Sequence, residues 1–205
     1  MECAAMRKVW VAGSMGPTML PLTKCPEKEA VMEAAFACQA EALMVGGVDL
    51  LLVETCYDVR NATAAMRGIA TAQERLGRSV PVVVTGTTSD ERGRIASGQT
   101  LGQLCAAVRQ VGAVSAFGLN CSFGVSDGLV GLVEWLSAEV ELPLAVYPSA
   151  GMPDASGRYC LSAERFAEIM CRVAEVDCVK IVGGCCGTTP CHIAALSKAL
   201  KSCAE

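Results

Sequence analysis

The chain has 205 residues, of which 52% are hydrophobic, 19% charged and 4% aromatic, which is typical of one folded α/β domain with a sizeable apolar core. Its formal net charge is -4, and no basic run is interleaved with aromatic residues, so neither nucleic acid nor an anionic membrane is an expected partner. No apolar stretch is long enough to span a bilayer, and residues 1–8 carry no apolar signal segment, so we expect a cytoplasmic protein.

Apolar runs alternate with helix-like segments along the whole chain. The predicted strands are residues 9–12, 48–53, 80–84, 114–119, 143–147 and 178–182, and the predicted helices are residues 27–45, 61–76, 99–111, 129–140, 163–174 and 190–201. Continuous apolar runs such as 48–53 (VDLLLV) indicate strands that are buried on both faces of a parallel sheet. The alternation predicts an α/β fold with right-handed crossovers, and polar, glycine-rich turns follow the strands, where ligand sites of such folds gather.

Thirteen cysteines and a single histidine limit the chemistry that this chain can perform. The cysteines are scattered through predicted helices and strands and their number is odd, so we expect mostly free thiols and no disulfide framework. One histidine excludes three-histidine zinc sites and two-histidine iron sites. We expect that residue, His192, to be solvated at the start of the last helix. Any metal would therefore be held mainly by sulfur or carboxylate.

Two adjacent cysteines, Cys185 and Cys186, follow the last predicted strand, and glycines on both sides allow a tight turn there. Cys121 follows the strand predicted at residues 114–119 in the same way. Because the carboxyl ends of parallel strands meet at one edge of the sheet, the three sulfurs can converge on one metal ion. The other interpretations are buried structural cysteines, a strained disulfide between neighbours, a redox pair and an anion-binding turn at a helix start.

Three thiolates without a fourth protein ligand describe a catalytic zinc site, because structural zinc sites are closed by four protein ligands. The open position suits a thiol substrate, which loses its proton at neutral pH when it binds the metal. These residues therefore predict alkyl transfer to a thiol. Glu54, which follows the strand at residues 48–53, is the candidate carboxylate at the same edge, and an internal ion pair is its alternative interpretation.

Six motifs in register resemble the homocysteine S-methyltransferase family. In chain order they are residues 11–18 (VAGSMGPT), 50–55 (LLLVET), 86–87 (GT) with 97–100 (SGQT), 118–121 (GLNC), 147–151 (YPSAG) and 182–190 (VGGCCGTTP). The segment GTTP after the cysteine pair is most similar to the homocysteine-binding domain of cobalamin-dependent methionine synthase. The resemblance covers nearly the whole chain and implies a fold of the (β/α)8 TIM-barrel type.

That resemblance also implies the roles of individual residues. Cys121, Cys185 and Cys186 are implied to hold Zn2+, which activates the thiol of homocysteine for methylation to methionine. Glu54 is implied as the catalytic and substrate-binding acid that binds the ammonium group of the amino acid, and Ser149 as a second substrate-binding residue. The methyl donor is expected to be methylcobalamin bound by another domain or chain, with S-methylmethionine or a methylated corrinoid protein as alternatives.

The chain departs from the family pattern in two places. The family barrel has eight βα units and this chain begins at what would be the third, so we expect residues 1–205 to form an N-terminally truncated homocysteine-binding domain. Six units cannot close an eight-stranded barrel, which predicts open sheet edges and a partner chain, a second copy or a further segment that completes it. The alternative function is a non-catalytic or partner-dependent barrel that binds zinc or thiol without turnover. Ser149 stands where the family usually has asparagine, which predicts altered recognition of homocysteine.

Overall fold

The computed structural model describes residues 9–202, in which strands and helices alternate from end to end. The strands are β1 (Ala12–Met15), β2 (Leu50–Cys56), β3 (Val82–Gly86), β4 (Ala116–Cys121), β5 (Leu144–Pro148) and β6 (Val179–Val182). The helices are α1 (Glu29–Val45), α2 (Val59–Leu76), α3 (Leu101–Val111), α4 (Asp127–Glu139), α5 (Ala163–Ala174) and α6 (Pro190–Ser202), with a short 3-10 helix, η1 (Pro26–Lys28), before α1. Among these described helices, none combines the length and the apolar character that a membrane crossing requires.

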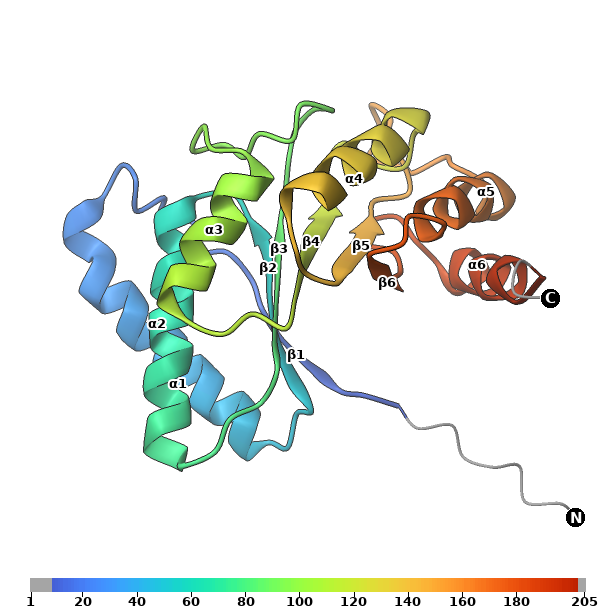
Figure 1. Ribbon diagram of the computed structural model, residues 1–205. Helices are drawn as coiled ribbons and strands as arrows, with labels where there is room; N and C mark the ends of the chain where they lie inside the picture. Colours follow the sequence, from blue (N-terminus) through green and yellow to red (C-terminus); the bar gives the residue numbers. More distant parts are fainter. Residues whose placement is uncertain (1–8, 203–205) are drawn as a thin grey trace, which may run out of the picture.

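The six strands form one sheet in which every neighbouring pair is parallel and the spatial order equals the chain order, β1 to β6. In Figure 1, α1, α2 and α3 lie at the left of the view and α4, α5 and α6 at the right. Residues of all six helices share one apolar core with the outer face of the sheet. The α/β fold predicted from the sequence is confirmed, and its topology is that of part of a (β/α)8 barrel. Within residues 9–202, β1 pairs only with β2 and β6 pairs only with β5, so both sheet edges are open.

Side chains alternate between the two faces of each strand, and the two faces have different surroundings. On the outer face, Leu51, Phe117 and Leu119 are fully buried in the main core, which the sheet forms with the helices. On the inner face, Val83 and Ala145 belong to a separate small apolar cluster. A hollow of about 230 Å³ lies over this cluster and is lined mainly by the side chains of Ala12, Leu50, Leu52, Val83, Ala145, Tyr147 and Ile181.

Local signals explain where the helices begin and end. Asp58 caps α2 by accepting hydrogen bonds from two backbone N–H groups of the first turn, and Gly77 ends this helix with a left-handed conformation. Thr100 and Gln103 form a reciprocal capping box at the start of α3. These caps fix the ends of the loops that follow β2 and β3 at the carboxyl edge of the sheet.

Four predicted strands, β1 to β4, were placed two or three residues too early in the chain, and β2, predicted at residues 48–53, is Leu50–Cys56. The first strand was predicted at residues 9–12, but β1 is Ala12–Met15, and Val9, Trp10 and Val11 are more than half exposed. Strands β3 and β4 likewise begin and end two residues later than predicted. The cause is the same in β3 and β4: the polar residues Thr85 and Asn120 continue the strands because their side chains bond to each other on the inner face.

Candidate metal and substrate site

The sulfur atoms of three cysteines meet at the carboxyl edge of the sheet. Cys121 is the last residue of β4, and Cys185 and Cys186 lie in the turn between β6 and α6. The Sγ atom of Cys121 is 2.7 Å from that of Cys185 and 3.6 Å from that of Cys186, and the last two are 3.9 Å apart. Among the described residues, this is the one group of three side chains whose His, Cys, Asp or Glu donor atoms are close enough for a shared metal ion.

The backbone around these cysteines is held in an uncommon conformation. Cys121 and Ser122 have φ angles of 53° and 56°, a left-handed region that costs a non-glycine residue of order 1 kcal/mol or more. Neighbouring turns compensate with hydrogen bonds: the Ser149 N–H donates to the Cys121 carbonyl, and the Ala150 N–H donates to the Cys186 carbonyl. The loop after β5 therefore ties the two cysteine-bearing turns to each other.

Position 187, directly after the cysteine pair, requires glycine for two reasons, its backbone conformation and its close packing. Its φ angle is 75°, and a Cβ atom there would lie 2.1 Å from Cγ of Tyr159. The Tyr159 ring thus rests on this turn, where partial burial and the nearby Cys186 raise the pKa of its phenol. The packing places an aromatic side chain from the loop before α5 beside the more exposed of the three sulfurs.

Proton sharing distinguishes the cysteines electrostatically. The hydrogen bond that the Cys121 thiol donates to Cys185, together with burial, raises the pKa of Cys121 far above its ordinary value. The same hydrogen bond stabilises the thiolate of Cys185 and lowers its pKa to about 6. Three sulfur donors of this kind fit a soft or borderline ion such as zinc better than a hard cation.

Glu54 lies on β2 at the same edge of the inner face. The Ser14 hydroxyl of β1 donates a hydrogen bond of 2.5 Å to its Oε1 atom. Tyr147 of β5 is its other neighbour, and burial, with a contribution from the Glu54 carboxylate, raises the pKa of this phenol. None of the ion pairs formed within residues 9–202 involves Glu54. The hydroxyl groups of Ser14 and Tyr147 thus neighbour the Glu54 carboxylate on the inner face of the sheet.

Comparison with known proteins now decides the family. The model of the homocysteine S-methyltransferase family matches residues 1–200 of this chain. The chain belongs to the homocysteine S-methyltransferase family. Its sheet resembles the apo form of the homocysteine methyltransferase MmuM from Escherichia coli with a TM-score of 0.69 at 24% identity, covering 94% of this chain and 63% of that one. The metallated form of MmuM gives a TM-score of 0.68 at 26% identity, covering 94% and 62%.

The chain therefore spans less than two thirds of the length of these solved homocysteine methyltransferases. An enolase from Streptomyces coelicolor matches 96% of this chain and 42% of its own with a TM-score of 0.52 at 14% identity, which is a likeness of fold alone. Membership of the homocysteine S-methyltransferase family, expected from the six motifs, is confirmed.

Ser149 is 5% exposed, and its backbone N–H bonds the carbonyl of Cys121. Besides the bond to Cys121, its carbonyl accepts from the N–H groups of Val125 and Gly151. The structure therefore brings Ser149 into the loop that braces the sulfur cluster. The roles predicted for Glu54 and Ser149 in substrate binding stay predictions.

One expectation about the site was wrong. His192 was expected to be a solvated residue at the start of α6, but it is 8% exposed. Its Nδ1 atom accepts from the Thr189 N–H, and its Nε2 atom bonds the Leu161 carbonyl at 3.0 Å. The ring also packs edge-on against Phe166 of α5. Apolar and backbone partners from α5 and the loop before it surround the ring, so His192 joins α6 to α5 and does not face solvent.

Asn120, immediately before Cys121, is a further site residue to which the sequence assigned no role. It is fully buried, and its amide bonds Thr55, Thr85 and Cys185. The available signal was its position: an amide side chain at the carboxyl end of an apolar strand requires partners. Thr55, the next-to-last residue of β2, could not be singled out in the same way. Its φ angle of 61° is left-handed, a conformation that is rare for a β-branched residue and that the sequence does not predict.

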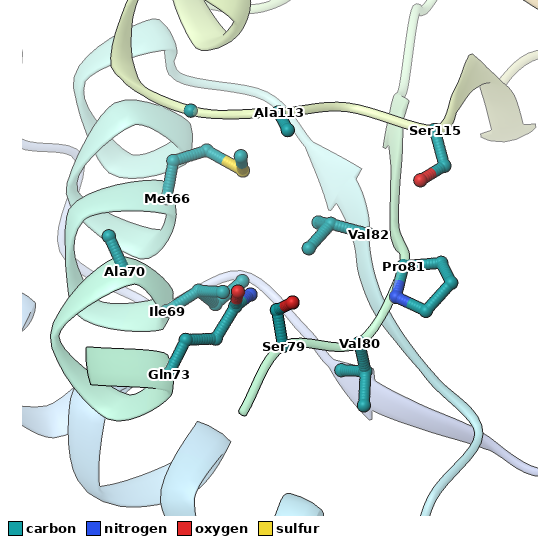
Figure 2. A pocket seen from close by; sticks show the side chains of 11 residues that line it. Met66, Ile69, Ala70, Gln73, Ser79, Val80, Pro81, Val82, Ala113 and Ser115 are labelled. Carbon is teal, nitrogen blue, oxygen red and sulfur yellow. The ribbon is translucent and has the colours of Figure 1, made fainter. Parts of the chain in front are cut away.

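A pocket at the other end of the sheet is chemically different. Figure 2 shows Met66, Ile69 and Gln73 of α2 facing the segment before β3 across this pocket, with Ser115 on the far side. Its volume is about 360 Å³, and no titratable side chain lines it. It lies at the amino ends of β3 and β4, away from the sulfur cluster, and has no acid or base that could activate its two serine hydroxyls, those of Ser79 and Ser115.

Proposed function

We propose that this chain is the thiol-activating part of a zinc-dependent methyltransferase that converts homocysteine to methionine. The observation that carries the proposal is the convergence of the Cys121, Cys185 and Cys186 sulfurs within 4.8 Å of one another at the carboxyl edge of a parallel sheet. Membership of the homocysteine S-methyltransferase family supports the substrate class.

The donor set favours zinc with one position left for substrate. Cys121, Cys185 and Cys186 would hold the ion as thiolates, and no His, Asp or Glu of residues 9–202 joins them as a fourth ligand. A zinc ion with three protein ligands supplies Lewis acidity at its open position, where a thiol is deprotonated at neutral pH and becomes nucleophilic. The affinity of thiolate-rich sites for hard oxygen substrates is lower, which is why a thiol is the preferred substrate.

Two further residues would orient the amino acid. The Glu54 carboxylate, held by Ser14 at 2.5 Å, would accept the substrate ammonium group. Ser149, whose backbone is bonded to Cys121, would place its hydroxyl near the bound substrate, directly or through a water molecule. Serine is shorter than the family's usual asparagine, so we propose weaker discrimination between homocysteine and other small thiols.

The methyl donor would come from outside the described residues. We propose methylcobalamin bound by another domain or chain, as in enzymes of the methionine synthase type. S-Methylmethionine and a methylated corrinoid protein are the competing donors. In each case the methyl group passes to the substrate sulfur, the donor–carbon bond breaks, and the thiol proton is released to solvent.

A second candidate function is supported by the open sheet. Strands β1 and β6 each have one unpaired side within residues 9–202, and the chain covers 63% of apo MmuM. This candidate is a partner-dependent barrel that binds metal and thiol but turns over only when two more βα units cover the inner face. It places residues 1–205 as a homocysteine-binding domain that lacks its first units.

The test is methyl transfer by the purified, zinc-loaded chain. Methionine formation from homocysteine is measured with methylcobalamin, S-methylmethionine or a methylated corrinoid protein, and bound zinc is measured in the same samples. Cys121→Ser should abolish both signals, whereas Cys38→Ser, at an exposed cysteine of α1, should change neither. Zinc binding without turnover supports the partner-dependent candidate. Absence of Cys121-dependent zinc contradicts both candidates.

A further inference from the structure

Asn120 is fully buried, and its side-chain amide uses all of its hydrogen-bonding capacity. The Oδ1 atom accepts from the Thr55 N–H and from the Thr85 hydroxyl, each at 2.8 Å. The Nδ2 atom donates to the Thr55 hydroxyl at 2.8 Å and to the Cys185 sulfur at 3.9 Å. One side chain thus connects β2, β3, β4 and the cysteine turn after β6.

The orientation of the Asn120 amide is fixed by the backbone N–H of Thr55. The Thr55 N–H can only donate, so the amide atom facing it must be the oxygen. The nitrogen then necessarily faces the opposite way, toward the Thr55 hydroxyl and Cys185. Reversing the amide would place two N–H donors against each other and leave both without an acceptor.

We propose that Asn120 is a positioning residue that holds Cys185 for metal binding and moderates the charge on its sulfur. This inference rests on the proposed metal-binding role of the three cysteines. An N–H donor withdraws electron density from the thiolate it bonds and restricts its rotation. Partners of this kind behind a metal ligand typically contribute about 10- to 100-fold to metal affinity.

The same amide links the sulfur cluster to the opposite side of the site. The Thr85 hydroxyl, which donates to Asn120, is also 2.8 Å from the hydroxyl of Tyr147. Tyr147 in turn neighbours the Glu54 carboxylate. An unbroken series of polar side chains therefore runs across the inner face from Glu54 to Cys185, and Asn120 is its member closest to the sulfurs.

The experiment compares Asn120→Asp with the parent after loading each protein with Co2+, whose sulfur-to-metal charge-transfer bands report on the thiolates. Aspartate keeps the shape and both acceptor roles but replaces the Nδ2 donor with an oxygen. We expect the charge-transfer band to move to longer wavelength, and Zn2+ affinity, measured by competition with a chromophoric chelator, to fall by about 10- to 100-fold.

Asn61→Asp is the matched control, because Asn61 is also buried and its amide bonds only residues 18–22. It should lower stability while leaving the cobalt band and zinc affinity as in the parent. If Asn120→Asp does not fold, Thr85→Val carries the test, with the same direction of band shift and a loss below about tenfold.

Unchanged spectra and affinity in the Asn120 or Thr85 variants, beside a parent with normal cobalt bands, would overturn the role of Asn120 alone. An equal loss in Asn61→Asp would also overturn it, because the effect would then be one of general stability. A parent that shows no sulfur-to-cobalt bands would instead overturn the metal site itself and this inference with it.

Discussion

On the outer face of the sheet, Leu51, Phe117 and Leu119 are buried in an apolar core against the helices. On the inner face, at the carboxyl edge, Thr85 and Asn120 bond each other and Glu54 accepts a hydrogen bond from Ser14. The same strands supply both sets, because consecutive side chains point to opposite faces. The outer face can therefore be optimised for packing while the inner face carries strained backbone and polar groups. This difference locates stability and chemistry on opposite sides of one sheet.

The largest expected loss of stability comes from a substitution where the backbones of β4 and β5 approach each other closely. A Cβ atom at Gly118 of β4 would lie 1.8 Å from the carbonyl oxygen of Ala145 on β5, and neither strand can move without breaking the ladder. Gly118→Ala should lower the free energy of unfolding by about 4 kcal/mol or more, measured by urea denaturation, or prevent folding.

Gly131→Ala in α4 is the control for that substitution, because a Cβ atom there meets nothing within 4 Å. Alanine should raise helix stability by about 0.5 to 1 kcal/mol. A Gly118→Ala protein as stable as the parent would show that β4 and β5 lie farther apart than described.

Adjacent leucines of β2 compare the two faces directly. Leu51→Ala removes a fully buried outer-face side chain and should cost about 2 to 5 kcal/mol. Leu52→Ala removes a partly exposed side chain over the inner hollow and should cost about 1 kcal/mol. Urea denaturation of both variants at several protein concentrations provides the measurement.

Equal losses in the two leucine variants, or a larger loss for Leu52→Ala that depends on protein concentration, would contradict the description of the inner face as uncovered. A loss for Leu52→Ala that depends on protein concentration would show that a second copy of the chain occupies the hollow.

The smallest expected effect concerns the periphery of the outer layer. Glu29 of α1 pairs with Arg60 and Arg67 of α2, and its hydrogen bond to Arg60 is the main cause that holds its pKa below the ordinary 4.5. A lowered folded-state pKa stabilises the protein above pH 4.5 and the effect disappears as pH falls through the lowered value. Glu29→Gln should therefore cost about 0.5 to 1 kcal/mol at neutral pH.

The same substitution should cost less in acid, because the parent carboxyl is protonated as well once the pH falls below its lowered pKa. Thermal unfolding of parent and variant at neutral pH and in acid gives the comparison. A difference in stability that increases in acid would contradict the assigned ion pairs.

The fold and the place of the sulfurs could be predicted because they depend on simple periodicities. Apolar runs that alternate with amphipathic segments require a parallel sheet, and the ends of parallel strands meet at one edge, so Cys121 had to approach Cys185 and Cys186. Their role as metal ligands remains a prediction that the 4.8 Å grouping supports.

Other features depend on tertiary contacts that no local pattern contains. The ends of β3 and β4 were misplaced because Thr85 and Asn120 satisfy each other only after the strands have paired. His192 was expected in solvent, but the Leu161 carbonyl and the Phe166 ring, both about 30 residues earlier in the chain, create its buried environment. The left-handed Thr55 is stabilised by Asn120, 65 residues away.

The central claim is that three cysteine sulfurs hold one metal ion and leave a position for a thiol. X-ray absorption at the zinc edge, recorded on the zinc-loaded chain before and after addition of homocysteine, tests it most directly. We predict three sulfur neighbours from Cys121, Cys185 and Cys186, with a fourth sulfur when homocysteine is added. Zinc bound by fewer than three sulfurs, or a sulfur count that homocysteine leaves unchanged, would contradict the claim.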